Sequence, residues 1–288
     1  MMRARRSALY LPGSNARALE KARTLAADVL ILDLEDAVAP DQKDIGRQQA
    51  AQAIAARGFG RSEIILRINA LGSIWWQDDV RSARGLRPDG LLVPKVNMVD
   101  DLDRVANALN GAIIPLWAMI ESPRAILNLS AIAGWKHGQQ KLAGLVVGTN
   151  DIAREARMAL IAGRAPMASL LAQCVIAARA NGLDVLDGVY NKIGDDEGLA
   201  AECQQARDFG FDGKTLIHPS QIDICNRTFT PDADEVARAR AIIAAFESPE
   251  NAGKGALRVD GQMVELLHAE IARRTLALAE AGGAQNDD

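Results

Sequence analysis

The sequence predicts an α/β fold, a closed (β/α)8 barrel of the TIM type, followed by a C-terminal extension. Eight short runs of mainly aliphatic residues recur along the chain, and a segment of helix-favouring composition follows each run. The runs contain few polar residues, which is typical of parallel strands buried on both faces. The length of 288 residues also suits one such barrel. We therefore expect the barrel to occupy residues 1–230 and the extension residues 231–288.

Each expected strand precedes an expected helix, as in parallel βα units rather than in a sandwich of two sheets. The strands are expected at Ala8–Leu11, Val29–Leu34, Glu63–Asn69, Gly90–Val96, Ile113–Ile120, Leu142–Val147, Asp184–Val189 and Lys214–Ile217. The segments between them are rich in Ala, Arg, Leu and Gln, which favour helix. Among these segments are Asn15–Ala27, Ile45–Arg57 and Ala165–Ala180.

The extension is expected to be mostly helical. Its first stretch, residues 231–246, opens with a proline and an aspartate, which favour the start of a helix. Ser248–Gly255 contains one proline and two glycines, which interrupt regular structure and indicate a linker. After the short segment Ala256–Gly261, the composition of Gln262–Ala281 again predicts helix.

Charge and composition argue against several classes of protein. A net charge of −4 disfavours a general nucleic-acid or membrane-surface binder, because such partners require a basic surface. The three cysteines show no CxxC motif or close pair, so we expect reduced thiols rather than a zinc site or disulfides. Only four apolar or aromatic residues separate the basic N-terminus from Pro12, too few for a signal peptide or membrane span. These features predict a cytoplasmic protein.

Polar residues stand at the carboxyl ends of six expected strands. Barrel enzymes build their active sites at this end of the strands, so these side chains are expected to surround one cavity. They are the stretch Asp33-Leu34-Glu35-Asp36, Arg67, Lys95, Glu121, Asp151 and His218.

Glu121 and Asp151 follow neighbouring strands, which would bring their carboxylates together. Two close carboxylates repel each other unless a proton or a cation lies between them. Oxygen ligands of this kind suit Mg²⁺ or Mn²⁺, and Mg²⁺ commonly takes one or two protein carboxylates together with water and substrate. Acidic residues are also favoured at the starts of helices. On these two residues alone, metal binding and helix capping are equally good interpretations.

Arg67 lies in an otherwise apolar strand, where burying its charge requires an anionic partner. Its planar guanidinium can bind a carboxylate through two hydrogen bonds. The partner is either a neighbouring side chain, Glu35 or Asp36, or the carboxylate of a 2-oxo acid whose carbonyl oxygen meets the metal.

Lys95 raises the alternative of Schiff-base chemistry with a carbonyl substrate. The surrounding carboxylates would keep its amine protonated, so we expect an ion pair with Glu35 or Asp36 instead. The sequence has only three histidines, which gives little support to a histidine-dependent triad. We expect His218 to have a structural role after the eighth strand.

These stretches resemble the citrate lyase β-subunit-like family, which belongs with the HpcH/HpaI aldolases and includes malyl-CoA and citramalyl-CoA lyases. The similarity spans nearly the whole chain, and its motifs are specific when they occur together in this order. The matching stretches are SALYLPGSNARALEKA (7–22), LILDLEDAVAPDQKDIGR (30–47), LRIN (66–69), VPKV (93–96), MIES (119–122), VGTND (147–151), LDGVY (186–190) and GKTLIHPSQI (213–222).

The resemblance implies a role for each rim residue. Glu121 and Asp151 match the family's Mg²⁺ ligands, and Arg67 matches the arginine that binds the oxo-acid carboxylate. Glu35 and Asp36 resemble residues that order metal-bound water.

The first-strand motif resembles the part of the family that meets coenzyme A. Tyr10, Arg17 and Lys21 are therefore candidates for contacts to the adenine and phosphates of a CoA substrate. Ordinary solvated or helix-facing side chains are the alternative interpretation.

The stretch ALRVDGQMVELLH (256–268) resembles the family's lid, in which an aspartate reaches the active site of a neighbouring subunit. Asp260 is the matching residue, within a lid expected near residues 253–261, and this implies a homo-oligomer, a trimer or hexamer. Without the resemblance, Asp260 before Gly261 would be taken as a turn residue, because Asp-Gly is a common turn pair. Asn150 departs from the family, which often has Glu or Asp there, and this affects the expected substrate selectivity.

Together these features predict a Mg²⁺-dependent carbon–carbon lyase. Its substrate would be a 3-hydroxy-3-carboxyacyl-CoA such as malyl-, citramalyl- or citryl-CoA, and its products an acyl-CoA and a 2-oxo acid. Arg67 and the metal would anchor the hydroxy-acid end, and Asp260 or water would protonate the thioester enolate. The alternatives are a citrate lyase β subunit acting on an acyl-carrier-protein thioester, a malyl-CoA-type thioesterase and a non-catalytic assembly subunit.

Overall fold

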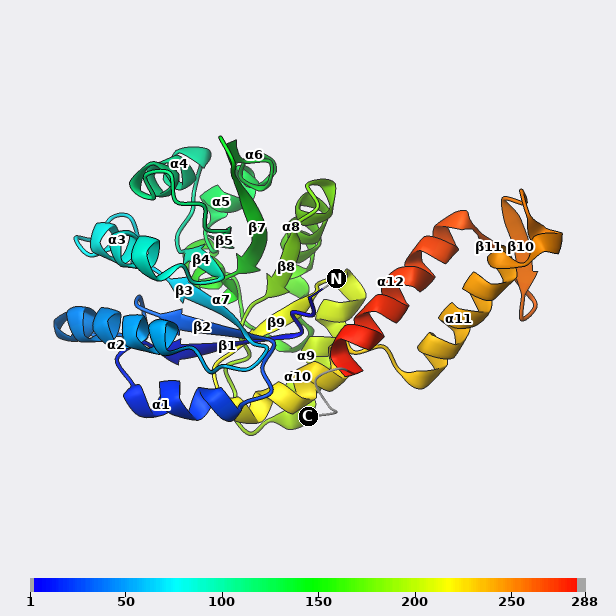
Figure 1. The fold of residues 1–288 in the computed structure, drawn as a ribbon, viewed down its shortest axis with the longest axis horizontal. Helices are drawn as coiled ribbons and strands as arrows, with labels where there is room; N and C mark the ends of the chain where they lie inside the picture. Colours follow the sequence, from blue (N-terminus) through cyan, green and yellow to red (C-terminus); the bar gives the residue numbers. More distant parts are fainter. Residues whose placement is uncertain (1–2, 284–288) are drawn as a thin grey trace. The chain divides into compact units, whose positions relative to one another are not determined.

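The computed structural model describes residues 3–283, which form two compact units (Figure 1). The first unit is Arg5–Cys225, and the second consists mainly of the chain from Asn226 onward. Residues 284–288 of the expected extension lie outside the described residues. Within the described chain, no helix has the length and apolar character needed to cross a membrane.

Eight parallel strands form a closed barrel in the first unit. The sheet runs in the order β5-β4-β3-β2-β1-β9-β8-β7, and an additional pairing of β5 with β7 completes the ring. The strands are β1 (Ser7–Pro12), β2 (Val29–Asp33), β3 (Glu63–Arg67), β4 (Gly90–Val93), β5 (Leu116–Ile120), β7 (Gln140–Val147), β8 (Asp184–Asp187) and β9 (Gly213–Leu216). The short strand β6 (Lys136–His137) pairs antiparallel with β7. The predicted fold class is confirmed.

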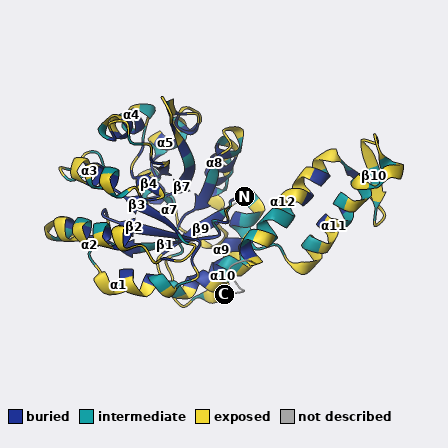
Figure 2. Cartoon of the chain, viewed as in Figure 1, coloured by how far each residue is buried: buried dark blue, intermediate teal, exposed yellow. Residues whose placement is uncertain are grey.

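Helices connect the strands and cover the outside of the barrel, where α2, α3 and α4 flank the sheet (Figure 1). The strands are largely buried, whereas the outer helix faces are exposed (Figure 2). The helices are α1 (Ala16–Lys21), α2 (Lys43–Ala56), α3 (Trp76–Leu86), α4 (Val99–Ala108), α5 (Pro123–Leu127), α6 (Leu129–Ala133), α7 (Thr149–Ala156), α8 (Ala168–Ala180), α9 (Asp196–Phe209) and α10 (Ile222–Phe229).

Prolines account for several differences between expected and observed boundaries. The strand expected to end at Val96 ends at Val93, because Pro94 has no N–H to donate to a neighbouring strand. Similarly, β5 begins only after Pro115. The helix expected from Ala165 begins at residue 168, after a 3₁₀ segment that contains Pro166.

Alternating positions on the strands face the inside of the barrel, as the two-residue period of a β-strand requires. Apolar side chains fill its centre: Ala8, Val29, Ile31, Ile65, Leu92, Trp117, Met119, Val146 and Leu186. Two residues farther along β1, β2 and β3, the same inward-facing rows carry Tyr10, Asp33 and Arg67. The sequence thus changes from apolar to charged where the strands reach their carboxyl ends.

The second unit is a pair of helices joined by a β-hairpin. Helix α11 (Ala233–Glu247) begins with a capping box in which Asp232 and Glu235 satisfy each other's backbone N–H groups. Helix α12 (Leu266–Gly283) packs along α11. Their shared apolar core comprises Ala239, Ile242, Val264, Ala269 and Ala272.

The prediction of helix from residue 262 is wrong for its first four positions. Gln262–Glu265 forms β11, which pairs antiparallel with β10 (Ala256–Val259). Asp260 and Gly261 connect the strands with φ angles of +49° and +79°, the left-handed pair that a tight two-residue hairpin requires. Apolar contacts of the hairpin with the helix pair favour strand over the local helical composition.

Candidate active site

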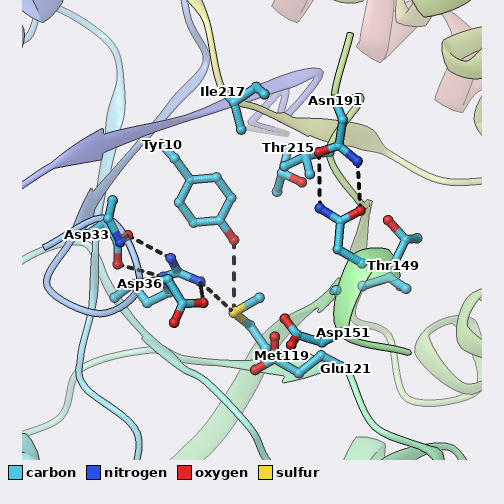
Figure 3. Close-up of a pocket in the computed structure, with 16 residues that line it drawn as sticks. Tyr10, Asp33, Asp36, Met119, Glu121, Thr149, Asp151, Asn191, Thr215 and Ile217 are labelled. Carbon is cyan, nitrogen blue, oxygen red and sulfur yellow. Dashed lines mark hydrogen bonds and ion pairs between the residues drawn. The ribbon is translucent and has the colours of Figure 1, made fainter. Parts of the chain in front are cut away.

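A cavity of about 340 Å³ opens at the carboxyl ends of the barrel strands (Figure 3). Seven residues named in the sequence analysis line it: Tyr10, Asp33, Asp36, Arg67, Glu121, Asn150 and Asp151. The other lining residues are Ala37, Met119, Val147, Gly148, Thr149, Val189, Asn191, Thr215 and Ile217.

Arg67 is held by Asp33, its partner in the parallel pairing of β2 and β3. The Arg67 Nε and Nη2 atoms each donate a hydrogen bond of 2.6 Å to the two carboxylate oxygens of Asp33. Burial opposes ionisation of Asp33, but the guanidinium outweighs it and lowers the pKa of the carboxyl group. Arg67 is therefore fixed in position by a buried, two-point ion pair.

The expected partners of Arg67, Glu35 and Asp36, make weaker contacts. The Arg67 Nη1 atom lies 3.3 Å from a Glu35 oxygen and 3.9 Å from an Asp36 oxygen. The guanidinium also lies 4.7 Å from the centre of the Tyr10 ring, within range for a cation–π contact. The sequence interpretation missed Asp33 as the principal partner.

Glu121 follows β5 and is almost completely buried. Its Oε1 atom accepts a 2.6 Å hydrogen bond from the backbone N–H of Lys95, whose φ of +54° is unusual for a residue other than glycine. A Cβ atom at Gly148 would lie only 2.5 Å from the Glu121 Cβ atom, so the absent side chain at Gly148 makes room for Glu121. Burial, reinforced by the negative charge of Glu35, raises the pKa of Glu121 to about 7.

Asp151 lies beside Glu121 in the cavity, in the first turn of α7 (Figure 3). Its carboxylate forms a 2.7 Å ion pair with Arg154, one turn along the helix. The capping interpretation is wrong for both residues. The N-cap of α7 is Gly148, which has no side-chain cap, and Asp151 stands in the first turn and pairs with Arg154. Ser122 caps the helix after Glu121, α5, by accepting a hydrogen bond from Ala125 N–H.

The two carboxylates fit a divalent cation that prefers oxygen ligands. Glu121 is buried without a side-chain cation as a hydrogen-bond partner, and a Mg²⁺ ion would supply the missing positive charge. Among residues 3–283 no cluster of three or more His, Cys, Asp or Glu side chains is arranged to hold a metal. Mg²⁺ commonly takes one or two protein carboxylates and completes its coordination with water and substrate, so Glu121 and Asp151 are the residues that could hold it.

Lys95 and Glu35 form the ion pair expected from the sequence. The Lys95 Nζ atom lies 2.8 Å from Glu35 Oε1 and 3.8 Å from Asp36 Oδ1. Burial lowers the pKa of Lys95, but the close contact with Glu35 and the surrounding carboxylates more than compensate and raise it. A protonated Lys95 is a poor nucleophile, which argues against a Schiff base.

Three other predicted residues lie elsewhere in the barrel. Arg17 and Lys21 are exposed on α1 and do not line the cavity that contains Tyr10. Their contact with CoA stays a prediction. His218 has the expected structural geometry, since its Nδ1 atom accepts a hydrogen bond from Ser220 N–H at the start of a 3₁₀ turn.

Asp260 belongs to the second unit, where it is the first of the two turn residues of the β10–β11 hairpin. The turn expected from the Asp-Gly pair is present. The catalytic role implied by the resemblance stays a prediction.

The cavity also contains residues that the sequence interpretation missed or did not connect. Asn150 and Asn191 form a reciprocal pair, each donating through Nδ2 to the Oδ1 atom of the other, at 3.0 and 2.8 Å. Asp33 was among the expected rim residues but was not connected with Arg67. Strand alternation could have indicated its inward position, because Val29, Ile31 and Asp33 share one face of β2. Asn191 lies in a loop, where no such periodicity exists.

The fold and the charged cavity at the carboxyl ends of its strands define an α/β-barrel enzyme. The family model "HpcH/HpaI aldolase/citrate lyase" matches residues 6–219. The chain belongs to this family, which confirms the resemblance seen in its motifs.

Curated relatives match along almost their whole length. A (3S)-malyl-CoA thioesterase of Cereibacter sphaeroides is 46% identical over 276 residues, which cover 96% of this chain and 95% of that protein. The citrate lyase subunit beta of Escherichia coli is 32% identical over 299 residues, which cover 99% of this chain and 96% of that protein.

Solved structures extend the similarity to proteins with bound ligands. CitE from Mycobacterium tuberculosis in complex with magnesium, acetoacetate and coenzyme A has a TM-score of 0.79 and 28% identity, covering 96% of this chain and 98% of that one. A citrate lyase beta subunit from the same organism, complexed with oxaloacetate and magnesium, has a TM-score of 0.66 and 28% identity, covering 79% and 98%.

Proposed function

We propose that this protein is a Mg²⁺-dependent lyase that cleaves a 3-hydroxy-3-carboxyacyl-CoA of the malyl-CoA or citramalyl-CoA type. The products are an acyl-CoA and a 2-oxo acid. The proposal rests mainly on one observation: Arg67, Glu121 and Asp151 line the same cavity. The magnesium, acetoacetate and coenzyme A bound by the M. tuberculosis relative support the same class of ligands.

Arg67 orients the substrate by binding its free carboxylate. Asp33 already occupies the edge formed by Nε and Nη2, so the substrate approaches the end of the guanidinium formed by Nη1 and Nη2. Glu121 and Asp151 are the residues that would hold Mg²⁺, which supplies Lewis-acid stabilisation of negative charge on the substrate oxygen.

Cleavage removes a proton from the C3 hydroxyl group and breaks the C2–C3 bond. The C3 oxygen becomes the carbonyl of the oxo acid, and the electron pair of the broken bond forms a thioester enolate at C2. Asp36 lines the cavity and its side chain is 59% exposed, and in this proposal its carboxylate receives the hydroxyl proton directly or through water. In this proposal Asp260 or water then protonates C2.

Hydrolysis of the same thioester is a second candidate, which the 46% identity to a (3S)-malyl-CoA thioesterase favours. Water would then attack the thioester carbonyl and release CoA together with an intact hydroxy acid. Both reactions use the same anchored carboxylate, so the identity of the products separates them.

A product assay with and without Mg²⁺ tests the proposal. Malyl-CoA and citramalyl-CoA are incubated with the enzyme, oxo acid is trapped as its hydrazone, and free thiol is titrated separately. Oxo acid in equal amount to an acyl-CoA supports the lyase, whereas free CoA with an intact hydroxy acid assigns the thioesterase. Absence of turnover with every substrate contradicts both. The Glu121→Gln variant controls for contaminating activities.

A further inference from the structure

Lys43, the first residue of α2, is buried behind the candidate active site. Only 6% of the residue is exposed, and it is not among the residues that line the cavity. Its Nζ atom donates a hydrogen bond of 2.8 Å to the Leu34 carbonyl oxygen and one of 2.6 Å to the Glu35 carbonyl oxygen. The ammonium group therefore binds the backbone of the loop that follows β2.

The same ammonium group faces a second loop at the carboxyl ends of the strands. The Lys43 Nζ atom lies 5.4 Å from the centre of the Trp75 ring, within range for a cation–π contact. Trp75 belongs to the segment between β3 and α3, and β3 is the neighbour of β2 in the sheet. Lys43 thus links the loops that follow two neighbouring strands. Burial lowers its pKa, and the carboxylates of Asp33 and Glu35 oppose this by attracting the protonated form.

The loop that Lys43 holds forms part of the cavity. Asp33, at its start, and Asp36 both line the cavity and lie on one side of it (Figure 3). The Asp33 carboxylate accepts hydrogen bonds from the backbone N–H groups of Glu35 and Ala37, at 2.8 and 3.0 Å. Asp33 therefore binds N–H groups of this loop while Lys43 binds its carbonyl oxygens, and together they fix the backbone.

The side chains on this loop depend on a precise backbone position. A Glu35 oxygen lies 3.3 Å from Arg67 Nη1, and an Asp36 oxygen lies 3.9 Å from the same atom. In the proposed reaction Asp36 receives the hydroxyl proton, which requires hydrogen-bond contact with the substrate or with one bridging water. A shift of the loop by about 1 Å would disturb this alignment. Lys43 reaches no substrate itself, so any effect on the reaction passes through the loop.

We propose that Lys43 is a positioning residue of the active site. It fixes the backbone of residues 34–38 and thereby places the Asp36 carboxylate relative to a substrate bound at Arg67. The inference rests on the proposed function, because it gives Lys43 a part in the same reaction. It predicts that loss of the Lys43 ammonium group slows the chemical step more than it weakens binding.

Lys43→Met removes the ammonium group but keeps an unbranched side chain of similar length. We expect kcat with the best acyl-CoA substrate to fall by about 30- to 100-fold and KM to change by less than about 3-fold. Mg²⁺ affinity, measured by calorimetry, should stay close to that of wild type, because Glu121 and Asp151 follow other strands. An unchanged kcat overturns the inference, and so does a loss of substrate or Mg²⁺ binding as large as the loss of kcat.

Amide hydrogen exchange measures the loop directly, without substrate or Mg²⁺. We expect exchange across residues 34–38 to be about 10-fold faster in Lys43→Met than in wild type, because the loop opens more often. Exchange in the barrel strands should change little. A folded Lys43→Met whose loop exchanges at the wild-type rate contradicts the inference. If Lys43→Met does not fold, Lys43→Gln decides by the same criteria, since it removes the charge and shortens the reach but keeps N–H donors.

Arg47→Met is the matched control. Arg47 lies one turn along α2 from Lys43 and its side chain is only 15% exposed, but it binds Asp44 and Asp79 rather than the loop. Thermal melting should show that both variants are destabilised, because each loses a largely buried cation. Only the Lys43 variant should show faster exchange at residues 34–38 and the lower kcat. The same changes in Arg47→Met would indicate a general loosening of α2 and overturn the inference.

The inference and the proposed function fail in distinguishable ways. If wild type is active and the Lys43 variants keep its kcat, the proposed function stands and the positioning role is wrong. If wild type turns over none of the acyl-CoA substrates, the proposed function is wrong and the role of Lys43 in that reaction fails with it. The exchange comparison then still decides whether Lys43 fixes the loop.

Discussion

Two of the buried charge clusters in the barrel differ in how completely their charges are neutralised. Next to β8 and β9, the fully buried Lys214 ammonium contacts Asp187 at 2.8 Å, Glu202 at 2.6 Å and the Gly188 carbonyl at 2.5 Å. Arg164 adds two hydrogen bonds of 2.8 Å to Asp187. Burial opposes ionisation of Asp187, but the two cations prevail and lower its pKa.

The cluster at the cavity rim, which includes Glu35 and Glu121, has buried carboxylate oxygens whose hydrogen bonding is incomplete. Neither oxygen of the buried Glu35 receives a hydrogen bond of normal geometry, although the Lys95 ammonium lies 2.8 Å from one of them. Burial outweighs the attraction of Arg67 and Lys95 and raises the pKa of Glu35, and the pKa of Glu121 is raised with it. The contrast indicates that the Lys214 cluster stabilises the fold, whereas the rim maintains an excess of negative charge suited to a cation.

The largest expected effect follows from removing one rim carboxylate. Glu121→Gln keeps the shape of the side chain but removes its charge, so we expect Mg²⁺-dependent turnover to fall by about 10³- to 10⁴-fold while the protein stays folded. Asp151→Asn should behave similarly. Steady-state kinetics and Mg²⁺ titration measure the effect, and wild-type rates with wild-type metal affinity in both variants would show the metal assignment to be wrong.

A substitution in the Lys214 cluster should reduce stability rather than turnover. Lys214→Met leaves the buried Asp187 and the partly buried Glu202 with less compensating charge, so we expect the free energy of unfolding to decrease by about 3–5 kcal/mol. Activity per folded molecule should change little. Urea unfolding and kinetics at low temperature test this comparison, and loss of activity without loss of stability would place Lys214 in the catalytic machinery.

The pH dependence of the protein's stability tests the raised pKa of Glu121 without an activity assay. The folded-state pKa of Glu121, about 7, lies above its ordinary value of 4.5. The stability provided by the protonated form is therefore complete below pH 4.5 and is lost as the pH rises through about 7. We expect metal-free Glu121→Gln to be more stable than wild type at pH 8, by up to about 3 kcal/mol.

Thermal melting of both proteins at several pH values, with and without Mg²⁺, measures this difference. Added Mg²⁺ should stabilise wild type and narrow the gap. If the variant is more stable than wild type by the same amount at pH 5 and pH 8, the difference does not come from the ionisation of Glu121.

A smaller effect is expected from Arg67→Lys. Lysine retains the charge but cannot bind Asp33 through two parallel hydrogen bonds and also present a planar edge to a substrate carboxylate. We expect kcat/KM to fall by about 50- to 100-fold, with weaker oxo-acid binding. Unchanged kinetics would show that Arg67 has only a structural role, which its ion pair with Asp33 could provide.

The smallest expected effect tests the hairpin. If Asp260 protonates the enolate, Asp260→Asn should reduce kcat by about 10-fold and change KM little. If it acts across subunits in a homo-oligomer, mixing this variant with Glu121→Gln should recover activity, because some sites then combine an intact metal site with an intact hairpin. Verified mixed oligomers that show no recovery would rule out action in trans.

The sequence identified the barrel and most of its charged cavity because both depend on regular repeats. Eight apolar runs predict eight strands, and the residues after each run predict the rim, where Arg67, Glu121 and Asp151 meet. Counting in steps of two along β2 would also have placed Asp33 beside Arg67. The loop residue Asn191 has no such periodicity, so its pairing with Asn150 became visible only in three dimensions.

The hairpin of the second unit was missed for a related reason. β10 and β11 are four residues each, too short for their alternation to outweigh the helical composition that follows. The Asp260-Gly261 pair predicted the turn, but a turn alone does not determine whether strands or helices flank it.

Gly148 limits how this enzyme can be re-engineered. Because even a methyl group there would collide with Glu121, a mutant library that randomises the loop after β7 would be dominated by variants in which Glu121 is displaced. Asn191 and Thr215 line the same cavity, and their side chains hydrogen-bond to Asn150 and to the Asp187 carbonyl oxygen, so they are the better starting points for directed evolution of substrate selectivity.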